Sequence, residues 1–340
     1  MKKYFISAML SALLFLTGCS AESSPEPVQG TFFAMDTMMD FTIYGESGLI
    51  DQSESLIASL ESLVSVTDAN SELYAINQTG SGTLTGKASS LMEQALEICR
   101  RTDDALDLSI YPIVRAWGFT TGSYQVPDEA EIQALLPLVD YRKIQYDAAT
   151  GTVTVTLPEG MEIDLGSVAK GYAGQLAAQM LREHGVQSAL LNLGGNVQTV
   201  GAKPDGSPWQ IGIKDPQGED AMMVLSVEDQ AVVTSGGYER YFEQDGQTYW
   251  HIMDPSTGHP ADSGLISVTI VGDEGVVCDG LSTALFVMGL EKAADLWAQS
   301  GDFEAVFVTA SGEVYITEGL RDHFALTERY ADTPVSVIER

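Results

Sequence analysis

The second half of the chain repeats short apolar segments separated by turn residues, and this pattern constrains the fold more than any other feature. Segments rich in Val, Ile, Leu and Thr alternate with Gly, Pro and Asp, which is typical of strands joined by tight turns. We predict strands at residues 152–157, 161–165, 188–193, 209–213, 222–227, 248–253, 265–271, 304–309 and 313–316. Helical spacing predicts helices at 167–183 and 279–290, with a shorter one at 291–299. Runs of strands with a few inserted helices indicate an α+β fold with mostly antiparallel sheets.

The first half contains more helical patterns and one interrupted strand. Residues 31–44 predict a strand broken at Met35-Asp36-Thr37, and helices are expected at 53–66, at 90–101 and from Asp128 onward. The glycine-flanked segment 80–86 is expected to be a loop. No repeat and no linker divides the chain, so we expect a single compact domain over residues 31–330, with room for two lobes, and a C-terminal tail at 331–340.

The N-terminus has the layout of a bacterial lipoprotein signal. Lys2 and Lys3 precede an apolar run at residues 5–16, and Leu16-Thr17-Gly18-Cys19 then has small residues before a cysteine. We predict a signal peptide at 1–18, lipid attachment including palmitate at Cys19, and a flexible tether at 19–30. The protein would then be lipid-anchored at the extracytoplasmic face of a bacterial membrane. The alternative is an ordinary cleaved signal with a chance cysteine.

Strong acidity limits the partners of this chain. There are 17 Lys and Arg against 48 Asp and Glu, a formal net charge of −31. Nucleic-acid binders attract phosphates with basic surface, so this class is excluded. A phosphate-bearing ligand would need a local lysine, a group of main-chain amides or a bound cation.

Common catalytic and metal-binding motifs are absent from the sequence. No GxGxxG, GxSxG or HExxH occurs, and residues 82–88 are one residue short of a P-loop. Cys99 and Cys278 are isolated and no CxxC is present, which indicates neither a disulfide framework nor a zinc site. Cys99 is expected to be a small core residue. Cys278 has two interpretations, an oxidation-sensitive thiol or a small buried residue.

Two polar segments at predicted helix starts can carry chemistry. Segment 164–171 ends a predicted strand and opens a helix, where main-chain amides favour an anion and Lys170 lies one turn in. Asp279 and Thr283 are four residues apart on one helix face, and their oxygens are ligands that Mg²⁺ prefers. The alternatives are an ordinary capped helix with an exposed lysine in the first case, and local capping contacts in the second.

A third segment, residues 249–260, contains two of the four histidines of the chain. His251 on the expected strand can face a cleft as a general acid or base, or it can be a structural histidine bonded in a turn. Segments 102–119 and 234–240 mix glycine with aromatic and short polar residues, as ligand-lining loops do, although turn formation explains much of this composition.

The order of these segments resembles one family closely. The chain is similar to the FAD:protein FMN transferases of the ApbE family from Phe33 to about Trp297. The matching segments are Met35-Asp36-Thr37 and residues 68–77, 112–119, 139–144, 164–172, 193–196, 234–236, 251–260 and 279–283.

The resemblance implies a function and a set of site residues. Members move the FMN half of FAD onto a Thr or Ser hydroxyl of a partner protein, forming a phosphodiester and releasing AMP. The implied Mg²⁺ ligands are Asp279, Thr283 and the main-chain carbonyl of Ser167, with Asp279 the essential one. His251 would position or deprotonate the incoming hydroxyl. Flavin and adenine contacts would fall on Met35, Tyr74, Ala105, Leu106, Asp107, Asp164, Lys170, His251 and Ile252. The acceptor would be an extracytoplasmic domain of a membrane redox protein.

The chain departs from the family pattern at several positions. Asp36 replaces a common Gly, Ser167 stands where Gly or Ala is usual, Leu106 replaces a frequent Phe, and Cys278 replaces Ala. A carbonyl ligand at Ser167 tolerates its change because the side chain is not used. Two other functions remain open at this point: an FAD pyrophosphatase releasing FMN and AMP, and a non-catalytic flavin-binding lipoprotein.

Overall fold

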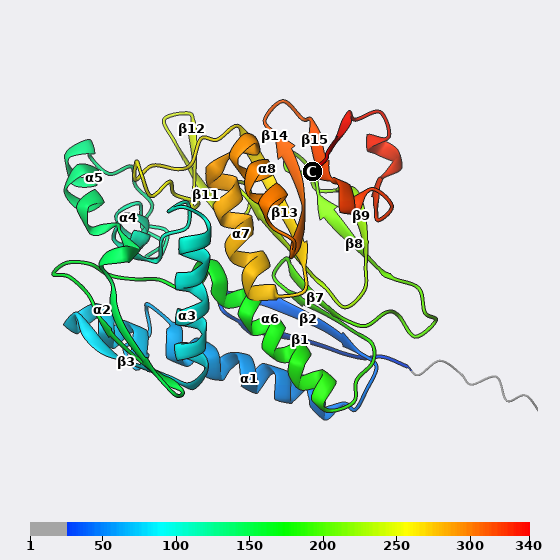
Figure 1. Cartoon of the computed structure of the whole chain (residues 1–340), viewed down its shortest axis with the longest axis horizontal. Helices are drawn as coiled ribbons and strands as arrows, with labels where there is room; N and C mark the ends of the chain where they lie inside the picture. Colours follow the sequence, from blue (N-terminus) through cyan, green and yellow to red (C-terminus); the bar gives the residue numbers. More distant parts are fainter. Residues whose placement is uncertain (1–25) are drawn as a thin grey trace, which may run out of the picture.

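A nine-stranded sheet forms the centre of the computed structural model, which describes residues 26–340 (Figure 1). The signal peptide predicted at 1–18 and Cys19 lie outside the described residues. Neighbouring strands are antiparallel except for the last pair, β15 and β17. The strand order is β1 (Val28–Ala34), β2 (Thr37–Ile43), β6 (Ala189–Leu193), β7 (Asn196–Val200), β10 (Ala231–Gly236), β13 (Leu265–Gly272), β14 (Phe303–Thr309), β15 (Val314–Thr317) and β17 (Val335–Ile338).

Both faces of the central strands β10, β13 and β14 are covered, which explains why these strands are so apolar. In β10, Val233 packs into the cluster under the helices, while its neighbour Val232 packs on the opposite face. That opposite face holds a three-stranded sheet made of β8 (Trp209–Lys214), β9 (Ala221–Val227) and β16 (Phe324–Leu326). Because successive side chains of a strand point to opposite faces, covering both faces demands apolar residues at consecutive positions.

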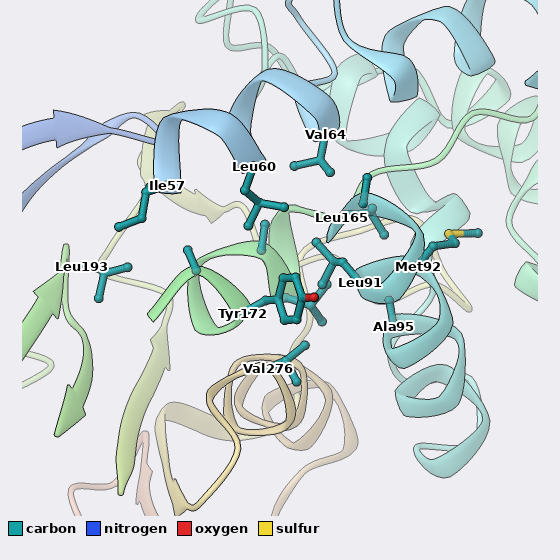
Figure 2. Close-up of a cluster of buried hydrophobic side chains, with 14 of the residues drawn as sticks. Ile57, Leu60, Val64, Leu91, Met92, Ala95, Leu165, Tyr172, Leu193 and Val276 are labelled. Atoms are coloured by element: carbon teal, nitrogen blue, oxygen red, sulfur yellow. The ribbon is translucent and has the colours of Figure 1, made fainter. Parts of the chain in front are cut away.

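Helices cover the first face. They are α1 (Gly48–Val64), α3 (Gly86–Arg101), α6 (Gly166–Glu183), α7 (Gly275–Met288) and α8 (Leu290–Gln299). Figure 2 shows side chains from α1, α3, α6 and α7 meeting around Tyr172, with Leu193 contributed by β6. Leu60 and Leu91 in this group are fully buried, so the space between these helices and β6 is closely packed.

Smaller elements extend the molecule on one side (Figure 1). A three-stranded sheet contains β3 (Ser81–Thr85), β4 (Gln145–Ala149) and β5 (Thr152–Thr156), and α2 (Glu72–Thr79) precedes it. A separate cluster includes Trp117 and Phe119, which contact aromatic residues of the hairpin formed by β11 (Tyr241–Gln244) and β12 (Gln247–Trp250). The remaining helices are α4 (Tyr111–Ala116) and α5 (Glu129–Leu135), with 3-10 turns at Leu108–Ile110, Leu136–Leu138, Tyr141–Lys143, Glu318–Leu320 and Glu328–Tyr330.

The α+β fold with mostly antiparallel sheets is confirmed, and two local predictions are wrong. Residues 161–165 are not a strand, because the side-chain amide of Asn77 binds both the N–H and the carbonyl of Ile163 at 2.8 Å and takes the place of a neighbouring strand. The expected loop at 80–86 contains β3, whose backbone pairs with β5 along its whole length.

Several element boundaries also differ from the predictions. Helix α7 begins at Gly275 rather than at Asp279, and β12 ends at Trp250 instead of continuing to 253. The tether expected at 19–30 overlaps β1, which starts at Val28. The expected tail at 331–340 contains β17, which pairs with β15 and extends the large sheet. Across residues 26–340, no helix combines the length and apolarity needed to cross a bilayer.

Candidate active site

A cavity of about 840 Å³ lies where the large sheet meets the start of α6 and the first half of α7. It brings together residues that are far apart in the sequence. The predicted site residues that line it are Met35, Ala105, Leu106, Asp107, Asp164, Ser167, Lys170, His251, Ile252, Asp279 and Thr283.

Tyr74 is the predicted site residue that does not line this cavity. It lies in the first turn of α2, a helix that Ser71 caps by accepting a hydrogen bond from the Tyr74 main-chain N–H at 3.2 Å. Leu73 and Ile76 are the fully buried residues of α2, and Tyr74 is half-buried. Helix α2 therefore packs Leu73 and Ile76 into the core, and Tyr74 does not reach the cavity.

Helices α6 and α7 touch backbone to backbone beside the cavity. A Cβ atom on Gly171 would lie 2.1 Å from the carbonyl oxygen of Gly275, and one on Gly275 would lie 2.4 Å from the carbonyl oxygen of Gly171. Only glycine permits this approach. As a result, the main-chain N–H of Gly171 reaches Asp279 and donates to its Oδ2 at 2.7 Å.

Asp279 is a buried carboxylate, 7% exposed, in the second turn of α7. Burial raises the pKa of Asp279, while the charge of Lys170 and the hydrogen bond from the Gly171 N–H act in the opposite direction. A carboxylate held in this environment gains from a nearby cation, because burial penalises the uncompensated charge. Placement inside the helix, rather than at its cap, excludes the capping interpretation of Asp279.

The groups around Asp279 form an oxygen-rich set. Thr283 lies one turn further along α7 and lines the cavity, as does Ser167 in the first turn of α6. The Ser167 main-chain carbonyl lies one helical turn before Gly171, whose N–H donates to Asp279, and a carbonyl oxygen has two lone pairs. Hydroxyl, carbonyl and carboxylate oxygens are the donors that Mg²⁺ prefers.

Within residues 26–340, no group of three or more His, Cys, Asp or Glu side chains is placed to hold a metal ion. A cation at Asp279 would therefore depend on main-chain, hydroxyl and substrate oxygens. Mg²⁺ usually keeps several waters and takes only one or two carboxylates together with substrate phosphates. The residues present thus fit Mg²⁺ bound together with a phosphate-bearing substrate.

Asp107 differs from Asp279 although both line the cavity. Its Oδ1 accepts from the N–H and the hydroxyl of Ser109 at 2.8 and 2.6 Å, and its Oδ2 accepts from the N–H of Tyr141 at 3.0 Å. Burial raises the pKa of Asp107, and these three hydrogen bonds oppose that shift. The carboxylate therefore joins two 3-10 turns, and its oxygens are engaged within the protein.

Asp164 and Lys170 lie at the start of α6 and face the cavity. Asp164 Oδ1 accepts from the N–H of Gly166 at 2.9 Å, which caps the free end of the helix. Burial raises the pKa of Asp164 against the opposing charges of Lys170 and Arg240. The charge of Lys170 also opposes the raised pKa of Asp279, so one ammonium group favours the ionised form of both carboxylates.

His251 is held in one tautomer by a backbone carbonyl. Its main-chain N–H donates to the Arg240 carbonyl at 3.0 Å, and its Nδ1 lies 3.2 Å from the same oxygen. A carbonyl only accepts, so Nδ1 carries the proton and Nε2 keeps its lone pair. Burial together with the charges of Arg240 and Lys170 lowers the pKa of His251 to about 4. The ring is therefore neutral at physiological pH and can accept a proton at Nε2.

The turn between β1 and β2 presents Met35 and Asp36 to the cavity. Both residues have left-handed backbone angles, with φ of 49° and 58°. Non-glycine residues adopt this region at some cost, and two in succession form the tight turn that closes a two-residue hairpin. The interruption predicted at Met35-Asp36-Thr37 is this turn.

Sequence reasoning left Asn196, Glu239 and Arg240 without assigned roles, although they line the cavity. Glu239 and Arg240 belong to segment 234–240, and Asn196 ends segment 193–196, so the signal was their membership in polar, glycine-containing segments. Arg240 donates to the Phe119 carbonyl at 2.6 Å, which joins the cavity wall to the aromatic cluster. Cys278, in contrast, is 1% exposed, and burial raises the pKa of its thiol strongly, as expected for a small packing residue.

Carboxylates outnumber cationic side chains in the cavity lining. The acidic residues are Asp36, Glu61, Asp107, Asp164, Glu239 and Asp279, and the basic residues are Lys170, Lys214 and Arg240. A bound diphosphate would meet net negative charge there. This balance, like the charge of the whole chain, favours a cation as a partner of any phosphate-bearing ligand.

Comparison with known proteins identifies relatives over most of the chain. The family model described as "ApbE family" matches residues 35–307. A protein of Klebsiella pneumoniae (strain 342) named FAD:protein FMN transferase is 36% identical over 285 residues, which cover 82% of this chain and 88% of that protein. A protein of Treponema pallidum (strain Nichols) with the same name is 33% identical over 290 residues, covering 80% of each chain.

Solved structures agree with the sequence comparison. The ApbE protein from Thermotoga maritima superimposes with a TM-score of 0.81 and 31% identity, covering 88% of this chain and 99% of that one. Flavin transferase ApbE from Vibrio cholerae gives a TM-score of 0.78 at 26% identity, with the same coverage. From its family match, its relatives and its fold, the chain belongs to the ApbE family.

Proposed function

We propose that this protein is a flavin transferase that moves FMN from FAD onto a Thr or Ser hydroxyl of an acceptor protein and releases AMP. The names of its relatives support the reaction class. The single structural observation that carries the proposal is Asp279, a buried carboxylate that lines the same cavity as Lys170 and His251. That cavity has the volume expected of a site for a small organic substrate.

The reaction exchanges one phosphate linkage for another. The acceptor hydroxyl oxygen forms a bond to the phosphorus on the FMN side of the FAD diphosphate, and the bond from that phosphorus to the bridging oxygen breaks. AMP leaves with the bridging oxygen, and the hydroxyl proton is transferred to a base. The products are a protein-linked FMN phosphodiester and AMP, and no oxidant or reductant is required.

Asp279, Thr283 and the Ser167 carbonyl would hold Mg²⁺ in this site. When bound, the ion would neutralise the charge that develops on the diphosphate oxygens. Lys170 adds a fixed positive charge on the α6 side of the cavity and acts on Asp279. Together with the positive end of the α6 helix dipole, it would bind and orient the diphosphate against the acidic lining.

His251 is the candidate base. Its Nε2 lone pair is available because Nδ1 is engaged by the Arg240 carbonyl, and its low pKa keeps the ring neutral. A base with a pKa of about 4 is weak, so it acts best by positioning the hydroxyl and accepting its proton as the new bond forms.

The proposal is tested by measuring whether an acceptor protein gains the mass of FMN. The protein, FAD, Mg²⁺ and a candidate acceptor domain are incubated, and the mass of the acceptor and the free nucleotides are measured. An acceptor heavier by one FMN, with an equal amount of AMP, supports transfer. Free FMN with AMP and an unmodified acceptor would indicate a pyrophosphatase, and unchanged FAD would indicate a carrier.

We also propose that the protein is anchored by lipid at Cys19 on the extracytoplasmic face of the membrane, where its acceptor is an exposed domain of a membrane redox protein. The support is the sequence Leu16-Thr17-Gly18-Cys19 after the apolar run. Cell fractionation tests it, since the wild type should remain in the membrane fraction and Cys19→Ala should not. Equal fractionation of the two proteins would refute the anchor.

A further inference from the structure

A chain of three hydroxyl groups connects α7 to strand β10 next to the candidate cation site. The Ser282 Oγ lies 2.8 Å from the main-chain oxygen of Asp279 and 2.7 Å from the Oγ of Ser235. The Ser235 Oγ lies 3.3 Å from the Oγ1 of Thr283. Ser282 is fully buried, whereas Ser235 and Thr283 also line the cavity.

The direction of each hydrogen bond in this chain is determined by counting protons. A hydroxyl has one proton to donate, and a main-chain carbonyl only accepts. The proton of Ser282 is therefore committed to Asp279, because otherwise two acceptor oxygens would face each other at 2.8 Å. The 2.7 Å contact must then be donated by Ser235 to Ser282.

The same count fixes the orientation of Thr283. Ser235 has used its proton, so at its contact with Thr283 it can only accept, and the Thr283 hydroxyl donates. The proton of Thr283 then points toward β10. A neutral hydroxyl binds a cation through a lone pair, so this is the orientation that leaves Thr283 ready to act as a ligand.

We propose that Ser235 is a positioning residue that holds the Thr283 hydroxyl with its proton turned toward β10, so that a Thr283 lone pair is available to a divalent cation at Asp279. This inference rests on the cation site in the proposed function and adds a residue to it. Without Ser235, the Thr283 hydroxyl can rotate and donate to a carbonyl of its own helix, as threonine commonly does.

Metal binding provides a test that is independent of turnover. Mn²⁺ is titrated into the full chain, with and without FAD, and the free ion is followed by electron paramagnetic resonance. We expect Ser235→Ala to weaken Mn²⁺ binding by about tenfold or more, the usual effect of losing a partner that orients a ligand. Ser235→Thr keeps the hydroxyl and should restore the affinity. Ser282→Ala frees the proton of Ser235 and should also weaken binding.

Thr269→Val is the matched control. The Thr269 hydroxyl lies 2.8 Å from that of Thr234 across β10 and β13, and it is also buried, but it does not line the cavity. Its loss should leave Mn²⁺ affinity unchanged. Thermal unfolding in chelator, measured for every variant, separates a loss of packing from a loss of metal binding.

Three results would overturn the inference. Wild-type affinity in both Ser235→Ala and Ser282→Ala would show that Thr283 needs no positioning. Equal weakening in Thr269→Val would show a general packing effect. A wild-type protein that transfers FMN but binds no Mn²⁺ would remove the cation site, and with it the role of Ser235, while leaving the transferase function in place.

Discussion

Two buried carboxylates in one cavity lining, Asp107 and Asp279, have different consequences for function. Asp107 receives three hydrogen bonds from Ser109 and Tyr141, and these engage both of its oxygens. The Asp279 carboxylate accepts a hydrogen bond at Oδ2 from the Gly171 N–H, and the charge of Lys170 acts on it. Burial raises the pKa of both groups. The comparison teaches that the identity and direction of the donors, more than burial itself, distinguish a structural carboxylate from one suited to a cation.

The largest expected effect is at Asp279. We expect Asp279→Ala to abolish release of AMP even in saturating Mg²⁺, because it removes the only charged side chain of the candidate ligand set. The assay is chromatography of nucleotides after incubation with FAD and acceptor. Full activity of this variant would show that the cation, if used, is held elsewhere.

Replacement of His251 is expected to have the next largest effect. His251→Ala should lower the transfer rate by about 10²-fold, the usual contribution of a general base. Wild-type circular dichroism of the variant would exclude misfolding. An unchanged rate would assign His251 to structure alone.

The pH behaviour of His251 follows from its lowered pKa. The ordinary value is 6.5 and the folded value is about 4, so the native ring stays neutral between these values while the unfolded chain binds a proton. His251 should therefore make stability fall as the pH drops through 6.5 toward 4, and its contribution to the slope should vanish only when the pH is well above 6.5. A ring-proton NMR titration of the protein without ligand should show the His251 transition near pH 4. A transition near the ordinary value would contradict the neutral imidazole.

Asp107 should affect stability more than metal binding. In Asp107→Asn, an amide N–H₂ would face either the Tyr141 N–H or the donors of Ser109, leaving buried donors without an acceptor. We expect the free energy of unfolding to fall by about 1–3 kcal/mol, measured by urea denaturation. Mn²⁺ affinity should match the wild type, and a loss comparable to that of Asp279→Ala would erase the distinction between the two carboxylates.

A comparable effect on stability is expected from the cation itself. Mg²⁺ at about 100 times its dissociation constant should raise the free energy of unfolding by about 2.7 kcal/mol in the wild type and in Asp107→Asn. Asp279→Ala should gain nothing from the same addition. Thermal unfolding with Mg²⁺ or chelator provides the measurement, and equal shifts in all three proteins would place the cation away from Asp279.

Local sequence patterns predicted many of the helices and strands. They did not predict features that depend on contacts between residues far apart in the chain. Apolar segments separated by turn residues predicted many of the strands, and the segments around Asp279 and Lys170 were found because they lie at predicted helix starts. The absence of a strand at 161–165 depends on Asn77 of α2, and no local pattern reveals that contact.

The roles of the two carboxylates were equally hidden in the sequence. The donors of Asp107 include the N–H of Tyr141, and Asp279 meets Gly171 only because two glycines let α6 and α7 touch. Resemblance to a family assigned Asp279 to the cation and Asp107 to flavin or adenine contacts. The three-dimensional hydrogen-bond pattern was needed to show that both oxygens of Asp107 are engaged by the protein itself.

The most direct test of the account uses membranes from cells that lack this protein. The membranes are incubated with FAD and either the wild-type protein or Asp279→Ala, in Mg²⁺ or in chelator, and flavin fluorescence is read after denaturing gel electrophoresis. We predict a fluorescent protein band that requires the wild-type protein, FAD and Mg²⁺ together. A band of equal strength in chelator or with Asp279→Ala would contradict a cation-dependent transfer centred on Asp279.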